Sequence, residues 1–148
     1  MTELLFVYGT LMSGAASSMG SGERARLAEE GRSLGPALLA ARIFDLGRYP
    51  GVVEVQSWPA VGAGSAGIVH GEVYRLASPT ATFAWLDLYE GIYPECAPQC
   101  EYTRDAAEVV LAAAPQNVLR AHVYVYRGGL DGARALPGGR WSPLHPEQ

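Results

Sequence analysis

Long hydrophobic runs are missing from this 148-residue sequence. The longest apolar stretches, near residues 4–7 and 109–114, are far shorter than the roughly 20 residues that a membrane-spanning helix needs. The first eight residues include Glu3 and have no basic lead-in, so they lack the pattern of a secretory signal peptide. We therefore expect a protein that does not insert into a membrane and that resides in the cytoplasm.

Lysine is absent, and the 11 basic residues are arginines scattered along the chain. No run of them forms the cationic stripe by which proteins bind nucleic acid, and the formal net charge is -4. The sequence thus predicts no nucleic-acid partner. A hydrophobic content of 49% excludes a chain that is disordered by composition, and the length suits one domain spanning residues 1–148.

Cysteine is scarce, because the chain has only Cys96 and Cys100, in a short segment that contains proline. A structural zinc site needs about four ligands at recognisable spacing. The three histidines, His70, His122 and His145, are not paired with one another at short range. We therefore expect no metal site, two reduced thiols as is usual in the cytosol, and structural roles for His70 and His122. A redox or metal-binding role is the alternative for the cysteine pair.

Secondary-structure signals are frequent in the rest of the sequence. Apolar and β-branched runs predict six strands, and two segments of helix-forming residues have helix start or stop signals. The predicted strands are residues 3–8, 37–45, 49–55, 67–76, 101–113 and 117–127, and the predicted helices are residues 23–31 and 79–90. A turn is expected at residues 114–116, and residues 14–22, 56–66 and 128–148 are expected to be irregular, with Trp141 as a candidate anchor for the tail.

This order of elements predicts the fold class. The strands and helices do not alternate as βαβ units, which favours an antiparallel or mixed sheet. Closing such a sheet removes its exposed edges, which suits a short chain. The prediction is an α+β fold: a small mixed, largely antiparallel β-barrel with about two flanking helices.

The junction after the first predicted strand carries the first candidate for chemistry. The strand ends in Tyr8-Gly9-Thr10-Leu11, where a glycine lets the chain turn sharply and lets successive backbone N–H groups point into one cavity. Such groups bind a carboxylate or stabilise a developing oxyanion. The alternative is that Gly9 only makes a turn while Tyr8 fills the core.

The end of the second predicted helix carries the other candidate. Ser78 and Pro79 are typical of a helix start, and Gly91 is typical of a left-handed helix end, which leaves Glu90 in the last turn. A carboxylate is unfavourable there because the helix C-terminus carries partial negative charge, and burial raises its pKa further. A carboxyl group with a raised pKa suits general acid–base catalysis near neutral pH. The alternative is that Glu90 points into solvent from a frayed turn.

The two candidates, in this order and separation, resemble the γ-glutamylcyclotransferase-like family, also called the AIG2-like family. The motifs that carry the resemblance are Phe6-Val7-Tyr8-Gly9-Thr10-Leu11-Met12 and Leu86-Asp87-Leu88-Tyr89-Glu90-Gly91. Four further segments agree with the family in its order: residues 47–51, 69–74, 102–104 and 122–126. The resemblance spans residues 4–127.

The resemblance implies a small β-barrel with a cavity at one end, a γ-glutamyl small molecule as substrate, and no metal or organic cofactor. The backbone of Tyr8, Gly9, Thr10 and Leu11 would hold the substrate's α-carboxylate and γ-carbonyl, and Glu90 would be the catalytic acid/base. The substrate's own amine would attack its γ-carbonyl and yield 5-oxoproline, so the protein supplies no nucleophile. A non-catalytic module that binds an amino-acid derivative is the alternative.

A few other residues have more than one interpretation. Tyr124 and Tyr126 share a strand face, so either side chain is a candidate to line the cavity; we assign Tyr124 to substrate binding. Glu72 is a second site carboxylate or a residue of the barrel rim or surface. Arg104 orients Glu90, meets an anionic substrate, or forms a structural ion pair. The sequence specifies neither the amine half of the substrate nor the oligomeric state.

Overall fold

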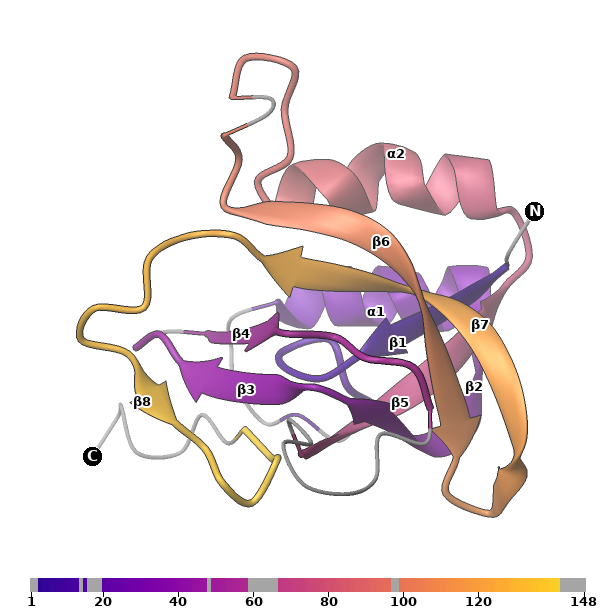
Figure 1. Ribbon diagram of the computed structural model, residues 1–148. Helices are drawn as coiled ribbons and strands as arrows, with labels where there is room; N and C mark the ends of the chain where they lie inside the picture. The colour runs from indigo at the N-terminus through magenta and orange to yellow at the C-terminus, as the bar shows by residue number, and fades with distance from the viewer. Residues whose placement is uncertain are drawn as a thin grey trace.

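The computed structural model describes residues 3–13, 15, 20–47, 49–58, 67–96 and 99–141. This part of the chain forms ten elements (Figure 1). Their bounds are β1 (Leu4–Val7), α1 (Ser21–Glu30), β2 (Gly31–Ala40), β3 (Arg42–Asp45), β4 (Pro50–Val53), β5 (Ile68–Leu76), α2 (Pro79–Tyr89), β6 (Tyr102–Leu111), β7 (Ala114–Tyr126) and β8 (Arg134–Ala135). Neither described helix combines the length and the apolar character that crossing a membrane requires.

Five strands close into a barrel because β1 pairs with β7 as well as with β5. The hydrogen-bonded order is β1-β5-β2-β6-β7, and the parallel pairing of Leu5 with His122 returns β7 to the first strand. The other four pairings around the barrel are antiparallel. Strands β4, β3 and β8 extend the sheet from β7. The predicted α+β fold, with a mixed, largely antiparallel barrel and two flanking helices, is confirmed.

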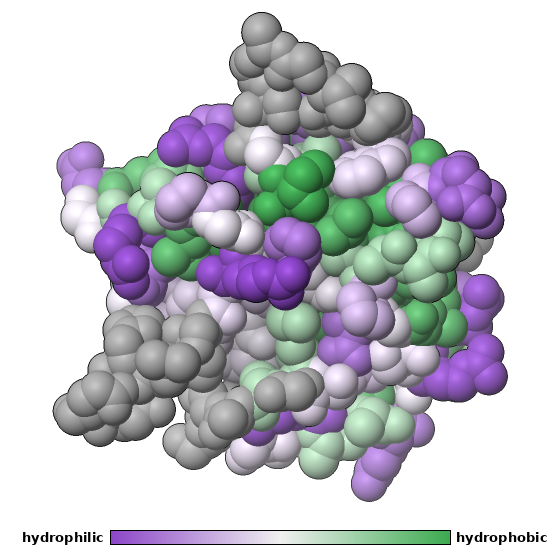
Figure 2. Space-filling model, turned by 90° about the horizontal axis from the view of Figure 1, so that it is seen from below, coloured by the Kyte–Doolittle hydropathy of each residue, from purple (hydrophilic) through white to green (hydrophobic). Residues whose placement is uncertain are grey.

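The alternation of side chains along β1 divides the core into two parts. Leu4 and Phe6 point into the barrel, where they join a buried cluster from the other strands. Leu5 and Val7 point outward and pack with a second cluster that includes Leu27 of α1 and residues of α2. The apolar faces of both helices therefore cover β1 from outside. On the face drawn in Figure 2, hydrophobic and hydrophilic residues are interspersed.

The single strand predicted over residues 37–45 is wrong. The chain forms β2 as far as Ala40 and β3 from Arg42, because the pairing partners change at this point. β2 lies between β5 and β6, whereas β3 lies between β4 and β8. β2 also begins earlier than predicted, at Gly31, which has an extended backbone (φ -145°) directly after α1.

The turn predicted at residues 114–116 is also misplaced. β6 and β7 form an antiparallel hairpin in which Leu111 pairs with Ala114, so the turn lies at residues 112–113. Pro115 is inside β7, close to a register irregularity between Val110 and Leu111. At such an irregularity the missing N–H of proline is tolerated, which is why proline did not end the strand.

The tail contains more structure than predicted. Arg134 and Ala135 form β8 against β3, and Trp141 packs on the cluster inside the barrel, as proposed for an anchor. The helix start predicted at Ser78 and Pro79 is confirmed, although the Ser78 side chain makes no capping hydrogen bond; its backbone carbonyl accepts one from Thr82 N at 3.1 Å. Most of the predicted loops, at residues 14, 16–19 and 59–66, and the tail after residue 141 lie outside the described residues.

Candidate active site

A cavity of about 300 Å³ lies where the end of β1 approaches the last turn of α2. The lining residues are Phe6, Val7, Tyr8, Gly9, Thr10, Leu11, Tyr49, Pro50, Tyr89, Glu90, Gly91, Glu101, Tyr102 and Tyr124. Segment 8–11, Glu90 and Tyr124, all nominated from the sequence, thus surround one space. Elements far apart in the sequence build it, because β1, α2, β6 and β7 meet at this end of the fold (Figure 1).

Gly9 is required for space rather than for an unusual backbone conformation. A Cβ at this position would lie 2.9 Å from Pro50 Cγ and 3.0 Å from its Cδ, and the φ of Gly9 is not in the left-handed region. The Gly9 carbonyl accepts a hydrogen bond from Met12 N at 3.1 Å, which closes a turn over residues 10–11. The backbone of the loop therefore lies directly against Pro50 at the cavity wall.

Both helices hold this loop through Thr10, which is buried. The Thr10 Oγ1 and the Tyr89 hydroxyl of α2 share a hydrogen bond of 3.1 Å. The Thr10 carbonyl accepts a hydrogen bond of 2.6 Å from Arg24 Nη1 of α1. The first contact holds the loop at the end of α2, next to Glu90, and the second ties it to α1.

Glu90 follows α2 directly and is partly buried. Its N–H donates to Leu86 O at 3.0 Å, and Gly91 takes the left-handed conformation (φ 83°), so the predicted helix stop is confirmed. Burial, and then the negative charge of Asp87, raise the pKa of Glu90 from 4.5 to about 7. A carboxyl group that titrates near pH 7 is present in both forms at neutral pH, so it can accept a proton and return it.

The cavity combines two kinds of polar group. The backbone of the 8–11 loop and the carboxyl group of Glu90 both belong to residues that line it. Among the described residues, no three His, Cys, Asp or Glu side chains come close enough together to hold a metal ion. The cavity thus brings a carboxyl group with a raised pKa next to residues 8–11.

The sequence of this chain matches the family described as "Gamma-glutamyl cyclotransferase, AIG2-like" over residues 5–143. The match covers almost all of the chain. This protein belongs to the AIG2-like γ-glutamyl cyclotransferase family. No curated protein gives a significant match.

Solved structures share the fold. The uropathogenic E. coli-specific protein c4763 has a TM-score of 0.62 at 21% identity, over 95% of this chain and 94% of that one. YkqA from Bacillus subtilis has a TM-score of 0.60 at 20% identity over 95% of this chain, which spans only 40% of the length of YkqA. An AIG2-like protein from Mus musculus has a TM-score of 0.54 at 21% identity, over 91% of this chain and 95% of that one. At these identities the likeness concerns the fold alone.

Eight lining residues were not nominated as site residues from the sequence: Phe6, Val7, Tyr49, Pro50, Tyr89, Gly91, Glu101 and Tyr102. All but Glu101 lie in segments that resemble the AIG2-like family, so a signal was present. Arg48, in the same segment as Tyr49, lies outside the described residues. Glu101 had no signal, and the structure places it at the cavity, where it accepts a hydrogen bond of 3.3 Å from the Tyr49 hydroxyl.

Of the two tyrosines on β7, Tyr124 lines the cavity, whereas the Tyr126 hydroxyl donates to Gly129 O at 3.1 Å. Arg104 does not line the cavity and forms an ion pair with Asp87 at 2.9 Å, the structural alternative for this residue.

Glu72 is neither a cavity residue nor a surface residue, because it is buried away from the lining set. Its carboxylate accepts hydrogen bonds from Ser13 N (2.7 Å), Ser13 Oγ (2.8 Å) and Ser33 Oγ (2.5 Å). It therefore fastens the segment after the 8–11 loop to β2. This buried anchoring role was missed because the serines that satisfy the carboxylate are distant in the sequence.

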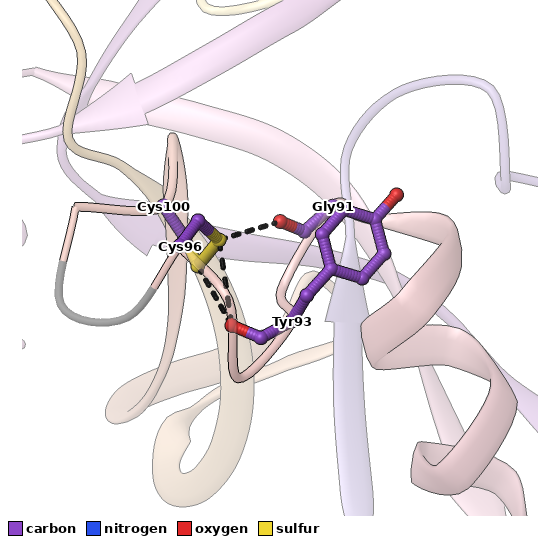
Figure 3. Close-up of a disulfide and its surroundings, with 4 residues drawn as sticks. All are labelled: Gly91, Tyr93, Cys96 and Cys100. Atoms are coloured by element: carbon purple, nitrogen blue, oxygen red, sulfur yellow. Dashed lines mark hydrogen bonds between the residues drawn. A yellow bond between two sulfur atoms is a disulfide. The ribbon is translucent and has the colours of Figure 1, made fainter.

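The prediction of two reduced thiols is wrong, because a disulfide joins Cys96 and Cys100. It lies in the segment between Glu90 and β6, with sulfur–carbonyl contacts of 3.5 Å from Cys96 to Gly91 O and 3.4 Å from Cys100 to Tyr93 O (Figure 3). The two Cα atoms are 4.9 Å apart, a separation that disulfides commonly have. The bond joins residues four positions apart, in the same segment that follows the candidate catalytic residue.

Proposed function

We propose that this protein is a γ-glutamylcyclotransferase, which converts a γ-glutamyl amine or peptide into 5-oxoproline and a free amine. The observation that carries the proposal is that Glu90, with a pKa raised to about 7, lines the same cavity as the backbone of residues 8–11. Membership of the AIG2-like family supports cyclotransferase chemistry in general. The proposed chemistry uses a proton-transfer group and hydrogen-bond donors, which residues of this cavity would supply.

The 8–11 loop is the proposed site for the glutamyl end of the substrate. Its backbone N–H groups would bind the α-carboxylate and the γ-carbonyl oxygen, while Tyr124 and Tyr102 would pack against the chain between them. Holding both ends of the glutamyl group folds it so that its amine approaches its own γ-carbonyl carbon. This arrangement makes the reaction intramolecular, which lowers the barrier through orientation.

Glu90 would then move the protons. Its carboxylate takes one from the α-ammonium, and the freed amine attacks the γ-carbonyl carbon, forming the ring C–N bond and an oxyanion that the loop N–H groups stabilise. The bond to the leaving amine breaks as Glu90 returns a proton to the departing nitrogen. Two protons in all pass from the α-nitrogen to that nitrogen, so the amine leaves as an ammonium ion and Glu90 ends as a carboxylate.

The test is release of 5-oxoproline from a panel of γ-glutamyl amines and peptides by the wild type, Glu90→Gln and Glu29→Gln. Glu29 is exposed on α1 and serves as the matched control. Removing a general acid–base lowers turnover by about 10²–10⁴-fold. We expect that loss in Glu90→Gln alone, with substrate binding retained by calorimetry, and a fall in the wild-type rate as the pH drops below about 7.

Two results would argue against this function. Equal turnover by the wild type and Glu90→Gln would remove Glu90 as the catalyst. Binding of γ-glutamyl compounds without turnover of any of them would favour a non-catalytic module that uses the same cavity.

A further inference from the structure

Asp87 lies one helical turn before Glu90 and collects three hydrogen bonds from the barrel. Its carboxylate accepts from Arg104 Nε at 2.9 Å, from Arg104 Nη2 at 3.2 Å and from the Tyr124 hydroxyl at 2.5 Å. Arg104 is on β6 and Tyr124 on β7, so one side chain joins α2 to two strands. A bidentate arginine–carboxylate pair is among the strongest and most directional contacts that proteins make.

Arg104 is held from two further sides. Its guanidinium lies over the Phe83 ring, with Cζ 4.0 Å from the ring centroid, and its Nη1 is 3.1 Å from His122 Nδ1. Because a guanidinium only donates, His122 accepts in this contact. The side chains of Arg104 and Asp87 are 27% and 25% exposed, so water screens their attraction less than in a surface pair. The Arg104–Asp87 pair therefore defines how the last turn of α2 docks on β6 and β7.

Tyr124 connects this pair to the cavity. Its side chain lines the cavity with Glu90 and donates to Asp87, and its backbone carbonyl accepts the hydroxyl of Tyr8. A displacement of Asp87 would therefore move both the wall of the cavity and the turn that carries Glu90.

We propose that Asp87 is a positioning residue for Glu90: tied to Arg104 and Tyr124, it fixes the end of α2 against the cavity and keeps a negative charge one helical turn away. This inference rests on the proposed role of Glu90. It assigns the aspartate of the Leu86–Gly91 segment to the acid–base machinery, although Asp87 does not line the cavity.

Among the groups around Glu90, Asp87 is the charged group that shifts the pKa of Glu90. The phenols of four tyrosines interact with Glu90: Tyr8, which follows β1, Tyr89 on α2, Tyr102 on β6 and Tyr124 on β7. Burial raises the pKa of each phenol, so all four are neutral near pH 7. The Glu101 carboxylate also lines the cavity. Asp87 raises the pKa of Glu90, and Arg104 partly offsets the charge of Asp87.

Two substitutions should shift the titration of Glu90 in opposite directions. Asp87→Asn removes the negative charge and leaves the cation of Arg104 without its counter-ion, so the pKa of Glu90 should fall by about one unit. Arg104→Gln leaves Asp87 uncompensated, so the pKa of Glu90 should rise. Asp105→Asn is the matched control, because Asp105 forms an exposed ion pair with Arg127.

The experiment is a carbon-13 NMR titration of the Glu90 carboxyl in the wild type and these three variants, with Glu90→Gln identifying the signal. The acidic limb of kcat/KM, measured on the γ-glutamyl panel, should move with the NMR midpoint. We expect a lower midpoint in Asp87→Asn, a higher one in Arg104→Gln, and a change within about 0.3 units in Asp105→Asn. A purely structural role for Asp87 would not produce shifts of opposite sign.

Shifts of the same sign, or shifts no larger than in Asp105→Asn, would overturn the inference. Because the titration needs no turnover, it separates this inference from the proposed function. The expected shifts in a protein without activity would retain the Asp87–Glu90 coupling and reject the cyclotransferase. Normal turnover with unchanged Glu90 titration midpoints would support the cyclotransferase and reject the Asp87–Glu90 coupling. If Arg104→Gln does not fold, the Asp87→Asn variant tests the inference alone: a lower Glu90 midpoint supports it, and an unchanged midpoint rejects it.

Discussion

The hydroxyl of Tyr8 donates a hydrogen bond of 2.6 Å to the main-chain carbonyl of Tyr124, and both residues line the cavity. The same hydroxyl accepts from Val52 N at 3.3 Å. This hydroxyl therefore links the residue after β1 to both β7 and β4. Burial raises the pKa of Tyr8 far above its ordinary value. The Tyr8 hydroxyl therefore has a structural role, and any contact of Tyr8 with a substrate would come from its backbone and ring.

Tyr8→Phe should consequently destabilise the protein. It leaves a buried carbonyl and a buried N–H without their partner, which costs about 1–3 kcal/mol. Tyr126→Phe is the control, because that hydroxyl donates to Gly129 O in an exposed contact. Urea unfolding of both variants measures the difference. Equal losses in the two variants would contradict a special structural role for the Tyr8 hydroxyl.

Gly9→Ala should impair the site more than the fold. The new Cβ would lie 2.9 Å from Pro50 Cγ, so the loop or Pro50 must shift at the cavity wall. Misplacement of a binding loop by about 1 Å can cost about 10²-fold in rate, so we expect a fall in kcat/KM of that order. Gly129→Ala, where a Cβ meets nothing within 4 Å, is the control. An unchanged kcat/KM in Gly9→Ala would show that this close approach is not needed for activity.

Glu90→Gln should stabilise the protein in a pH-dependent way. The pKa of Glu90 is about 7 in the folded state and 4.5 as an ordinary carboxyl, so the folded state binds the proton more tightly. Stability is therefore lost as the pH rises from about 4.5 to about 7, and the loss is complete above that range. At pH 8.5 the substitution should raise the free energy of unfolding by up to about 3 kcal/mol, and at pH 4.5 by less than about 1 kcal/mol.

Denaturant unfolding at the two pH values measures this prediction. A stabilisation of the same size at both would mean that the gain does not come from removing the buried charge. Together with loss of turnover, the expected result would show that the raised pKa of Glu90 is maintained at the expense of stability.

The Cys96–Cys100 bond can be tested by alkylation. We expect neither cysteine to react with iodoacetamide in the folded protein until a reductant is added, because both sulfurs are in the disulfide. Replacing both by serine should cost about 2 kcal/mol or less, since the closed loop is short. Mass spectrometry counts the adducts. Two adducts without reductant would restore the prediction of free thiols.

Local chemistry was sufficient for elements whose signals lie within their own residues. The apolar run of β1, the proline at the start of α2 and Gly91 at its end each act on neighbouring backbone, and these elements were predicted to within a residue or two. The break between β2 and β3 was not predictable in this way. It depends on which strands lie alongside, and those partners are remote in the sequence.

Local signals in the sequence were enough to nominate the segment Tyr8–Leu11 and the carboxylate of Glu90 as candidates, because a glycine after a strand and a glutamate at a helix end have local physical consequences. Three other features required the folded chain: the shared cavity, its lining by Tyr124 rather than Tyr126, and the ion pair between Asp87 and Arg104. Cavities, pKa shifts and ion pairs arise from groups that folding brings together. Their energies depend on distance and burial, which no single segment of the sequence contains.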